Sequence, residues 1–148
     1  MKTPERNKAA NNIPSNMPKQ SPVFKRLEEL KSSPNIVLNG EIVNDETCVQ
    51  VAQFMKENDI ITKLESSDSY ITAKGLGIIS ESISNSKCLK KIAFPRNKIS
   101  ENDKGFEEFI NALIMNKTVT DLDLSENFLT DNSAILLSNL IIHNNTLK

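Results

Sequence analysis

The stretch Val119–Leu129 decides the fold; it reads Val-Thr-Asp-Leu-Asp-Leu-Ser-Glu-Asn-Phe-Leu. Polar and apolar residues alternate in its first half, as in a strand that buries one face, so Leu122 and Leu124 are expected to point into a core. Beyond this stretch the apolar residues recur at helical spacing. The sequence therefore predicts a strand near 121–124 followed by a helix near 131–143.

The same sequence pattern recurs along the chain, as in a protein built from repeats. Copies begin at Ile61, Leu89 and Val119, which are 28 and 30 residues apart, and a weaker copy occupies residues 33–60. The expected strands lie near 36–38, 63–66, 91–94 and 121–124, and the expected helices near 46–57, 74–85, 104–115 and 131–143. Strand and helix alternating at a constant period favour parallel strands side by side, with helices on one face and right-handed connections.

The pattern Leu122-x-Leu124-x-x-Asn127-x-Leu129, followed by a helix, resembles a leucine-rich repeat. The length of the repeat and its full helix are similar to those of the ribonuclease-inhibitor-like class of leucine-rich repeats. The resemblance implies an α/β fold, a right-handed leucine-rich-repeat solenoid of about four strand–helix repeats, which would form a domain over residues 34–148. The repeats are expected at about 33–60, 61–88, 89–118 and 119–146, with the start of a further one at 147.

Asparagine follows two of the expected strands, at Asn97 and Asn127. Its amide both donates and accepts hydrogen bonds, so the two side chains are expected to form a short ladder along the turns. Ser69 occupies the same position one repeat earlier and is too short to span the same gap. We therefore expect that turn to be looser.

The N-terminal part of the chain differs from the repeats in charge and in composition. Residues 1–33 carry seven Lys and Arg against three Glu. Residues 1–20 are expected to form a disordered basic arm, and residues 21–33 a short capping helix that begins at Ser21-Pro22. The apolar face of that helix would cover the first repeat. A docking peptide for a separate partner is the alternative.

Composition excludes several classes of function. The net charge of −1 gives no reason to expect nucleic acid as a partner, and two Cys with one His exclude a Cys₄ or Cys₂His₂ zinc site. No signal peptide or transmembrane segment is visible, so we expect a location in the cytoplasm or delivery into a host cell. No pairing of nucleophile and base is visible either. We expect no enzymatic activity, no cofactor and no catalytic or metal-binding residues.

The candidate binding surface is the concave face of the strands, where the side chains between the core positions point outward. Lateral ion pairs are expected between Lys91 and Asp121 and between Arg96 and Glu126. A solvated charged face with such neighbour pairs is the simpler interpretation, and a partner-binding patch is the functional one. Its candidate residues are Lys63, Glu65, Lys91, Arg96, Asp121, Asp123 and Glu126.

The favoured function is a protein–protein interaction module that binds another protein on this concave face, as an effector or a regulatory scaffold. The alternative is a GTPase-activating protein of the leucine-rich-repeat type, for which Arg96, the one arginine of the repeats, would be the candidate finger. A truncated remnant is a third interpretation. The apolar last helix and the unpaired edge of the last strand also predict self-association through the C-terminal edge.

Overall fold

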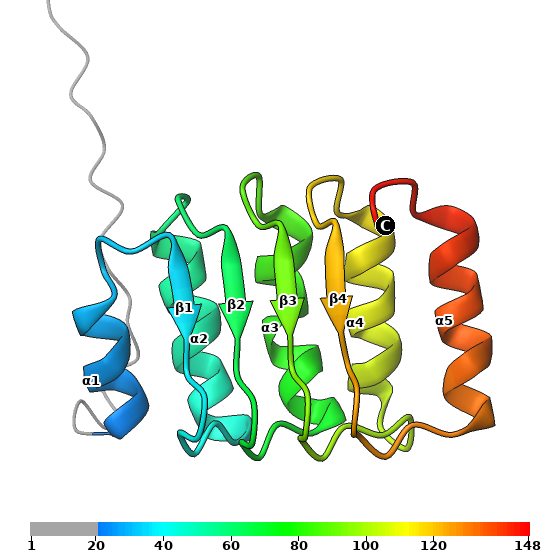
Figure 1. Cartoon of the computed structure of the whole chain (residues 1–148), viewed down its shortest axis with the longest axis horizontal. Helices are drawn as coiled ribbons and strands as arrows, with labels where there is room; N and C mark the ends of the chain where they lie inside the picture. Colours follow the sequence, from blue (N-terminus) through cyan, green and yellow to red (C-terminus); the bar gives the residue numbers. More distant parts are fainter. Residues whose placement is uncertain (1–20) are drawn as a thin grey trace, which may run out of the picture.

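The computed structural model describes residues 21–148, so the expectation of a disordered arm over 1–20 lies outside the described residues. Helices and strands alternate from the first helix onward (Figure 1). The helices are α1 (Pro22–Glu29), α2 (Asp45–Glu57), α3 (Ala73–Asn85), α4 (Lys104–Met115) and α5 (Asp131–His143). The strands are β1 (Asn35–Val37), β2 (Lys63–Glu65), β3 (Lys91–Ala93) and β4 (Asp121–Asp123). The strands and helices expected from the sequence are all present, with small differences at their ends.

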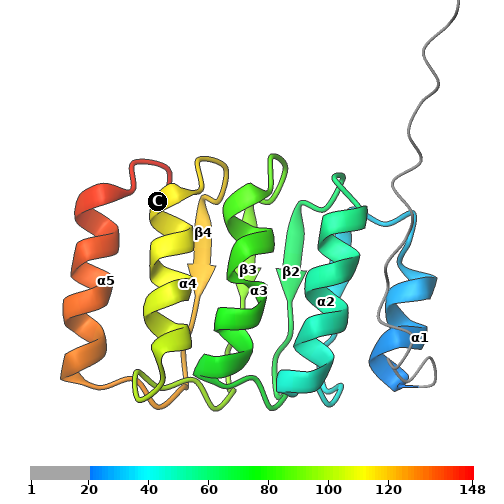
Figure 2. The same cartoon turned by 180° about the vertical axis from the view of Figure 1, so that it is seen from behind.

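The strands form one parallel sheet in the order β1-β2-β3-β4. The repeats are in register, because Lys63 pairs with Lys91 and Lys91 pairs with Asp121. In Figure 1 the strands lie in front of the helices, run downward and follow one another from left to right. Figure 2 shows the helices in front as a second layer. Each strand–helix–strand connection is therefore right-handed, as expected for such units.

The core lies between the strand layer and the helix layer. Leu64 and Ile92 of the strands are buried, and the large fully buried side chains include Phe94, Phe106 and Phe109. Leu122 and Leu124, expected to be core residues, pack against this core and are only partly buried. They belong to the last repeat, beside which the described residues place no further strand–helix unit.

The helices begin where a side chain caps them. Thr72 and Thr130 cap α3 and α5, and Asp103 caps α4, each by accepting a hydrogen bond from a backbone N–H of the first helical turn. Helix α4 packs so closely on α3 that its second residue has to be glycine. A Cβ on Gly105 would lie 2.1 Å from the backbone oxygen of Ala73.

The side chains of Asn97 and Asn127 link the third and fourth repeats to the repeat before each of them, as the sequence predicts. The Nδ2 of Asn97 donates to the backbone oxygen of Ser66 at 2.7 Å, and its Oδ1 accepts from the N–H of Ile71 at 3.1 Å. Asn127 makes the equivalent bonds to Phe94 and Ile99. At the serine turn, the hydroxyls of Ser66 and Ser69 approach the equivalent oxygen of Leu38 only at 3.4 and 3.5 Å. That turn lacks the short amide bonds of the other two.

Helix α1 lies at the N-terminal end of the array, next to α2 (Figure 1). Ser21 caps it by accepting from the N–H of Phe24, and Pro22 is its first residue. Val23 and Leu27 are buried. The hydroxyl of Ser21 also donates to Gln50 of α2 at 2.7 Å, which fixes the start of α1 against the first repeat.

Candidate protein-binding surface

The outward-pointing side chains of the sheet form what we call the strand face: Lys63, Glu65, Lys91, Asp121 and Asp123, with Arg96 and Glu126 in the turns that follow β3 and β4. Sheet register places Lys63, Lys91 and Asp121 in one row across three strands. Glu65, Ala93 and Asp123 form a second row. All seven candidate residues therefore lie along one side of the molecule, on consecutive repeats.

The backbone after each strand turns through the left-handed region at one recurring position. The φ angles are 53° at Asp68, 52° at Arg96 and 53° at Glu126, and Gly40 holds the position in the first repeat with a φ of 74°. Asparagine, aspartate and glycine adopt this conformation most readily, so an arginine and a glutamate there are unusual. Because they share this conformation, Asp68, Arg96 and Glu126 form a third row, and Asp68 is from here on counted with the strand face.

Arg96 is held between two carboxylates. Its Nε and Nη2 donate to the two oxygens of Asp68 at 2.8 and 2.7 Å, and its Nη1 lies 3.6 Å from Glu126. The pairing with Glu126 confirms the sequence-based expectation, whereas the shorter bidentate contact with Asp68 was not predicted. The hydrogen bonds from Arg96 lower the pKa of the Asp68 carboxyl, and those to Asp68 raise the pKa of the guanidinium.

Lys91 does not form the ion pair with Asp121 that the sequence predicts, which corrects that expectation. In residues 21–148 no salt bridge joins these two residues, although their Cα atoms are register partners. The carboxylate of Asp121 instead accepts a hydrogen bond from the neighbouring Thr120 hydroxyl at 2.5 Å. The charge of Lys91 acts through space on the next row, where it contributes to lowering the pKa of Glu65 and of Asp123.

The two ends of the strand face differ in charge. At the β2 end, Glu65 is paired with Lys63 at 2.5 Å and accepts a hydrogen bond from Asn39, which together lower its pKa. At the β4 end, the hydroxyl and N–H of Ser125 donate to Asp123 and lower its pKa. Within the described part of the chain, neither Asp121 nor Asp123 has a cationic side chain within ion-pair distance. The β4 end therefore carries two neighbouring acidic side chains without an ion-pair partner among residues 21–148.

A carboxylate that sequence reasoning missed reinforces the last repeat. Glu101 lies in the turn before α4 and accepts hydrogen bonds from the hydroxyls of Ser133 and Thr130, at the start of α5. Both bonds favour the ionised form, so the pKa of Glu101 falls from 4.5 to about 2. Asp45 makes the corresponding bond to Thr72 at the start of α3, at 2.7 Å. In both cases the acid precedes the threonine that caps the next helix by about one repeat, 27 and 29 residues, and this spacing could have revealed the bonds from the sequence.

Other chemistry is sparse among residues 21–148. They contain no group of His, Cys, Asp and Glu that could hold a metal ion. Burial raises the pKa of the Cys48 thiol to about 12, with a smaller contribution from Asp45, so it is a protonated core residue at neutral pH. None of the helices in this part of the chain has the length and apolar character needed to cross a bilayer.

Comparison with known proteins establishes the fold. No protein-family model matches the sequence, and no curated protein matches it. Among solved structures, the chain is similar to one titled "Leiomodin-1 Actin-Binding Site 2 (ABS2)", with a TM-score of 0.73 and 19% identity over 86% of this chain and 76% of that one. The parallel strand–helix repeats fit a leucine-rich-repeat-like fold. At 19% identity this likeness concerns the fold alone.

Proposed function

We propose that this protein is a leucine-rich-repeat interaction module of the ribonuclease-inhibitor-like class, and that it binds a partner protein through the strand face. The observation that carries the proposal is the pair of carboxylates at the β4 end, Asp121 and Asp123, neither of which has a cationic side chain within ion-pair distance among residues 21–148. A partner that presents Lys or Arg side chains would supply the missing counter-charges. The module would act as an effector or a regulatory scaffold without chemistry of its own.

The contrast with the rest of the strand face supports this choice. Arg96, Asp68 and Glu126 already satisfy one another, and Lys63 satisfies Glu65. Such exposed pairs contribute little to stability, typically about 0.2–1 kcal/mol each. These ion pairs do, however, fix where each charged group lies. A partner would therefore meet an ordered pattern of charges in which, of the strand-face carboxylates, only those at β4 lack an ion-pair partner among residues 21–148.

The test uses the full chain as bait in an extract of the cells that produce it, with the bound proteins quantified by mass spectrometry. The variant Asp121→Asn with Asp123→Asn removes two charges at β4 and keeps the side-chain shapes. The control Asp59→Asn with Glu107→Gln removes two exposed charges away from the strand face. We expect the first variant to lose the specific partner and the control to keep it. Equal retention by both would refute binding at β4.

Actin is a defined partner to include, because the neighbour in the comparison carries an actin-binding site in its title. Co-sedimentation with filaments and inhibition of monomer assembly would each report binding. A negative result would leave the proposal of a basic partner in place, since the likeness at 19% identity concerns the fold.

The alternative of a GTPase-activating protein meets a physical objection at Arg96. An arginine finger has to reach a bound nucleotide, whereas Arg96 is held by two hydrogen bonds to Asp68 and lies near Glu126. We therefore expect GTPase turnover to be the same with the wild-type chain and with Arg96→Ala. A rate increase that disappears in that variant would favour the alternative.

The outer surface of α5 favours self-association as a second role. Ile135, Ile141 and Ile142 are 69%, 74% and 72% exposed, and a hollow beside β4 is lined by Leu122 and Leu137. Burying this surface against a second copy would stabilise both chains. We expect sedimentation of the full chain to depend on concentration, and Ile141→Lys with Ile142→Lys to abolish that dependence. A monomer at all concentrations would refute this role.

A further inference from the structure

A second exposed row runs along the turns that join strands to helices, on a different side of the repeats from the strand face. We call it the loop-edge row: Ile42, Tyr70, Lys98 and Phe128, one residue from each repeat. Three of its four members are apolar or aromatic and open to solvent, with exposures of 62% at Ile42, 47% at Tyr70 and 65% at Phe128, and the fourth is the cation Lys98. Large side chains in equivalent, exposed positions on consecutive repeats form a continuous contact surface, not isolated surface residues.

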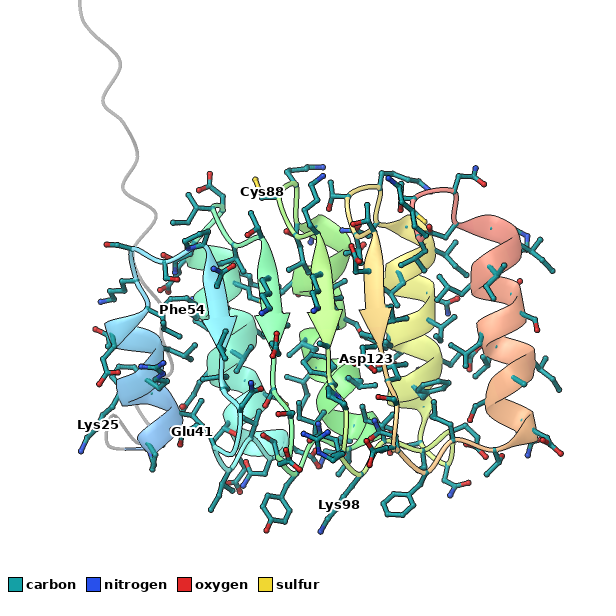
Figure 3. All side chains as sticks on the ribbon, in the orientation of Figure 1. Lys25, Glu41, Phe54, Cys88, Lys98 and Asp123 are labelled. Carbon is teal, nitrogen blue, oxygen red and sulfur yellow. The ribbon has the colours of Figure 1, made fainter. Side chains whose placement is uncertain are left out.

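The row is held in place by its backbone and by one side-chain contact. The N–H of Lys98 donates to the backbone oxygen of Ile71, and the N–H of Phe128 donates to that of Ile99, each at 2.9 Å. The ammonium of Lys98 lies 4.6 Å from the centre of the Tyr70 ring, a cation–π contact. Figure 3 shows Lys98 pointing outward from the lower edge of the molecule, opposite the edge that carries Cys88.

The turns that carry this row are acidic. Between the end of each strand and the start of the next helix, carboxylates outnumber cations by five to two, and the cations are Lys98 in the row itself and Arg96, which is already paired with Asp68. Glu101 stays ionised because its pKa is about 2. The carboxylates are Glu41, Asp68, Glu101, Asp103 and Glu126. An apolar stripe with acidic margins is complementary to an apolar stripe with basic margins.

We propose that the loop-edge row is a docking site for a basic amphipathic helix of a partner protein. Neighbouring parallel strands are about 4.8 Å apart, so the row offers one side chain roughly every 5 Å. A helix rises about 5 Å over three to four residues, so apolar residues at i, i+3 or i+4, and i+7 would meet successive repeats. An extended segment presents same-side residues about 6.6 Å apart and falls out of step with the row.

The inference concerns a surface other than the strand face and stands or falls separately from the proposed function. Its test uses the full chain and a fluorescent synthetic peptide about four helical turns long, with leucine at every third or fourth position and lysine and alanine elsewhere. One control peptide has the same composition in scrambled order, and a second carries glutamate in place of lysine. Binding is measured by fluorescence anisotropy.

The informative variant is Tyr70→Ser with Phe128→Ser, which removes two exposed rings and should leave the circular dichroism spectrum unchanged. The matched control is Ile60→Ser with Met115→Ser, where the side chains are 46% and 68% exposed. We expect the loop-edge variant to weaken binding at least about tenfold, as loss of interface anchors does, and the control to bind normally. The scrambled and acidic peptides should bind at least about tenfold more weakly to the wild type.

Four results would overturn the inference. Equal binding of the ordered and scrambled peptides would show attraction by charge alone, and absence of binding would show that the row does not recognise a helix. Loss of binding in Asp121→Asn with Asp123→Asn, with none in the loop-edge variant, would place the peptide on the strand face. A change in sedimentation of the peptide-free chain on Tyr70→Ser with Phe128→Ser would identify the row as a contact between two copies.

Discussion

Replacing Asn97 by alanine tests the interaction that joins the second and third repeats. The amide is 5% exposed and bonds to the oxygen of Ser66 and the N–H of Ile71, both in the preceding repeat. Asn97→Ala leaves both backbone groups unsatisfied in a site too enclosed for full hydration. Each such group costs about 1–3 kcal/mol, so for the two groups we expect a loss of about 2–6 kcal/mol.

That loss is a large part of the 5–15 kcal/mol typical of a domain. The measurement is urea denaturation of the full chain followed by circular dichroism, with Asn85→Ala as the control. Asn85 is exposed at the end of α3, and its side chain makes no hydrogen bond within residues 21–148. We expect the control to change the unfolding free energy by less than about 0.5 kcal/mol. An equally small effect of Asn97→Ala would refute the role assigned to the asparagine.

Three further predictions concern stability. The pKa of Glu101 is about 2 against an ordinary 4.5, so the stability that its ionised form contributes is complete above pH 4.5 and is lost as the pH falls toward 2. Glu101→Gln should therefore lower Tm at pH 7 and flatten the fall of Tm below pH 4.5. A Tm profile that the substitution leaves unchanged would contradict this. Gly105→Ala should lower Tm by several degrees, because its Cβ would meet the oxygen of Ala73 at 2.1 Å, and an unchanged melt would contradict the close packing. Deleting residues 1–20 should leave Tm nearly unchanged, whereas deleting 1–33 also removes the buried side chains of α1 and should lower it; equal effects would argue against capping.

The repeat architecture could be predicted because the pattern of each repeat is visible in residues that are neighbours in the sequence. Alternation around Leu122 and Leu124 and helical spacing beyond them are properties of neighbouring residues, and the period of the phrase adds the long-range order. The asparagine bonds could also be predicted, since an amide at a strand end has few other partners. The expectation of a looser turn at Ser69 followed from side-chain length and agrees with the long contacts to Leu38.

The charge pattern could be predicted only in part. Register identifies which residues neighbour one another, but it does not say which of two acids a long side chain reaches. Arg96 donates two hydrogen bonds to Asp68 and lies farther from Glu126, although all three residues share the left-handed conformation, so neither register nor backbone conformation chooses between the two carboxylates. Lys91 was assigned to Asp121 by register, whereas that carboxylate bonds to Thr120.

The loop-edge row escaped sequence reasoning for a different reason. The alternating pattern draws attention to the strands, and the row lies two residues beyond the left-handed position, where no periodicity of strand or helix applies. Aligning the repeats does reveal it, since Tyr70, Lys98 and Phe128 occupy the same place in three consecutive copies. Their exposure, however, is a property of the folded turns.

The proposal of a binding module makes a definite statement about where a partner protein lies. Hydrogen–deuterium exchange of the full chain, alone and with the captured partner, locates the contact without any substitution. We predict slower exchange in β4 and the turn through Glu126, with exchange in the middle of α3 unchanged. Protection confined to the helices, with β4 exchanging as in the free chain, would contradict binding at the strand face.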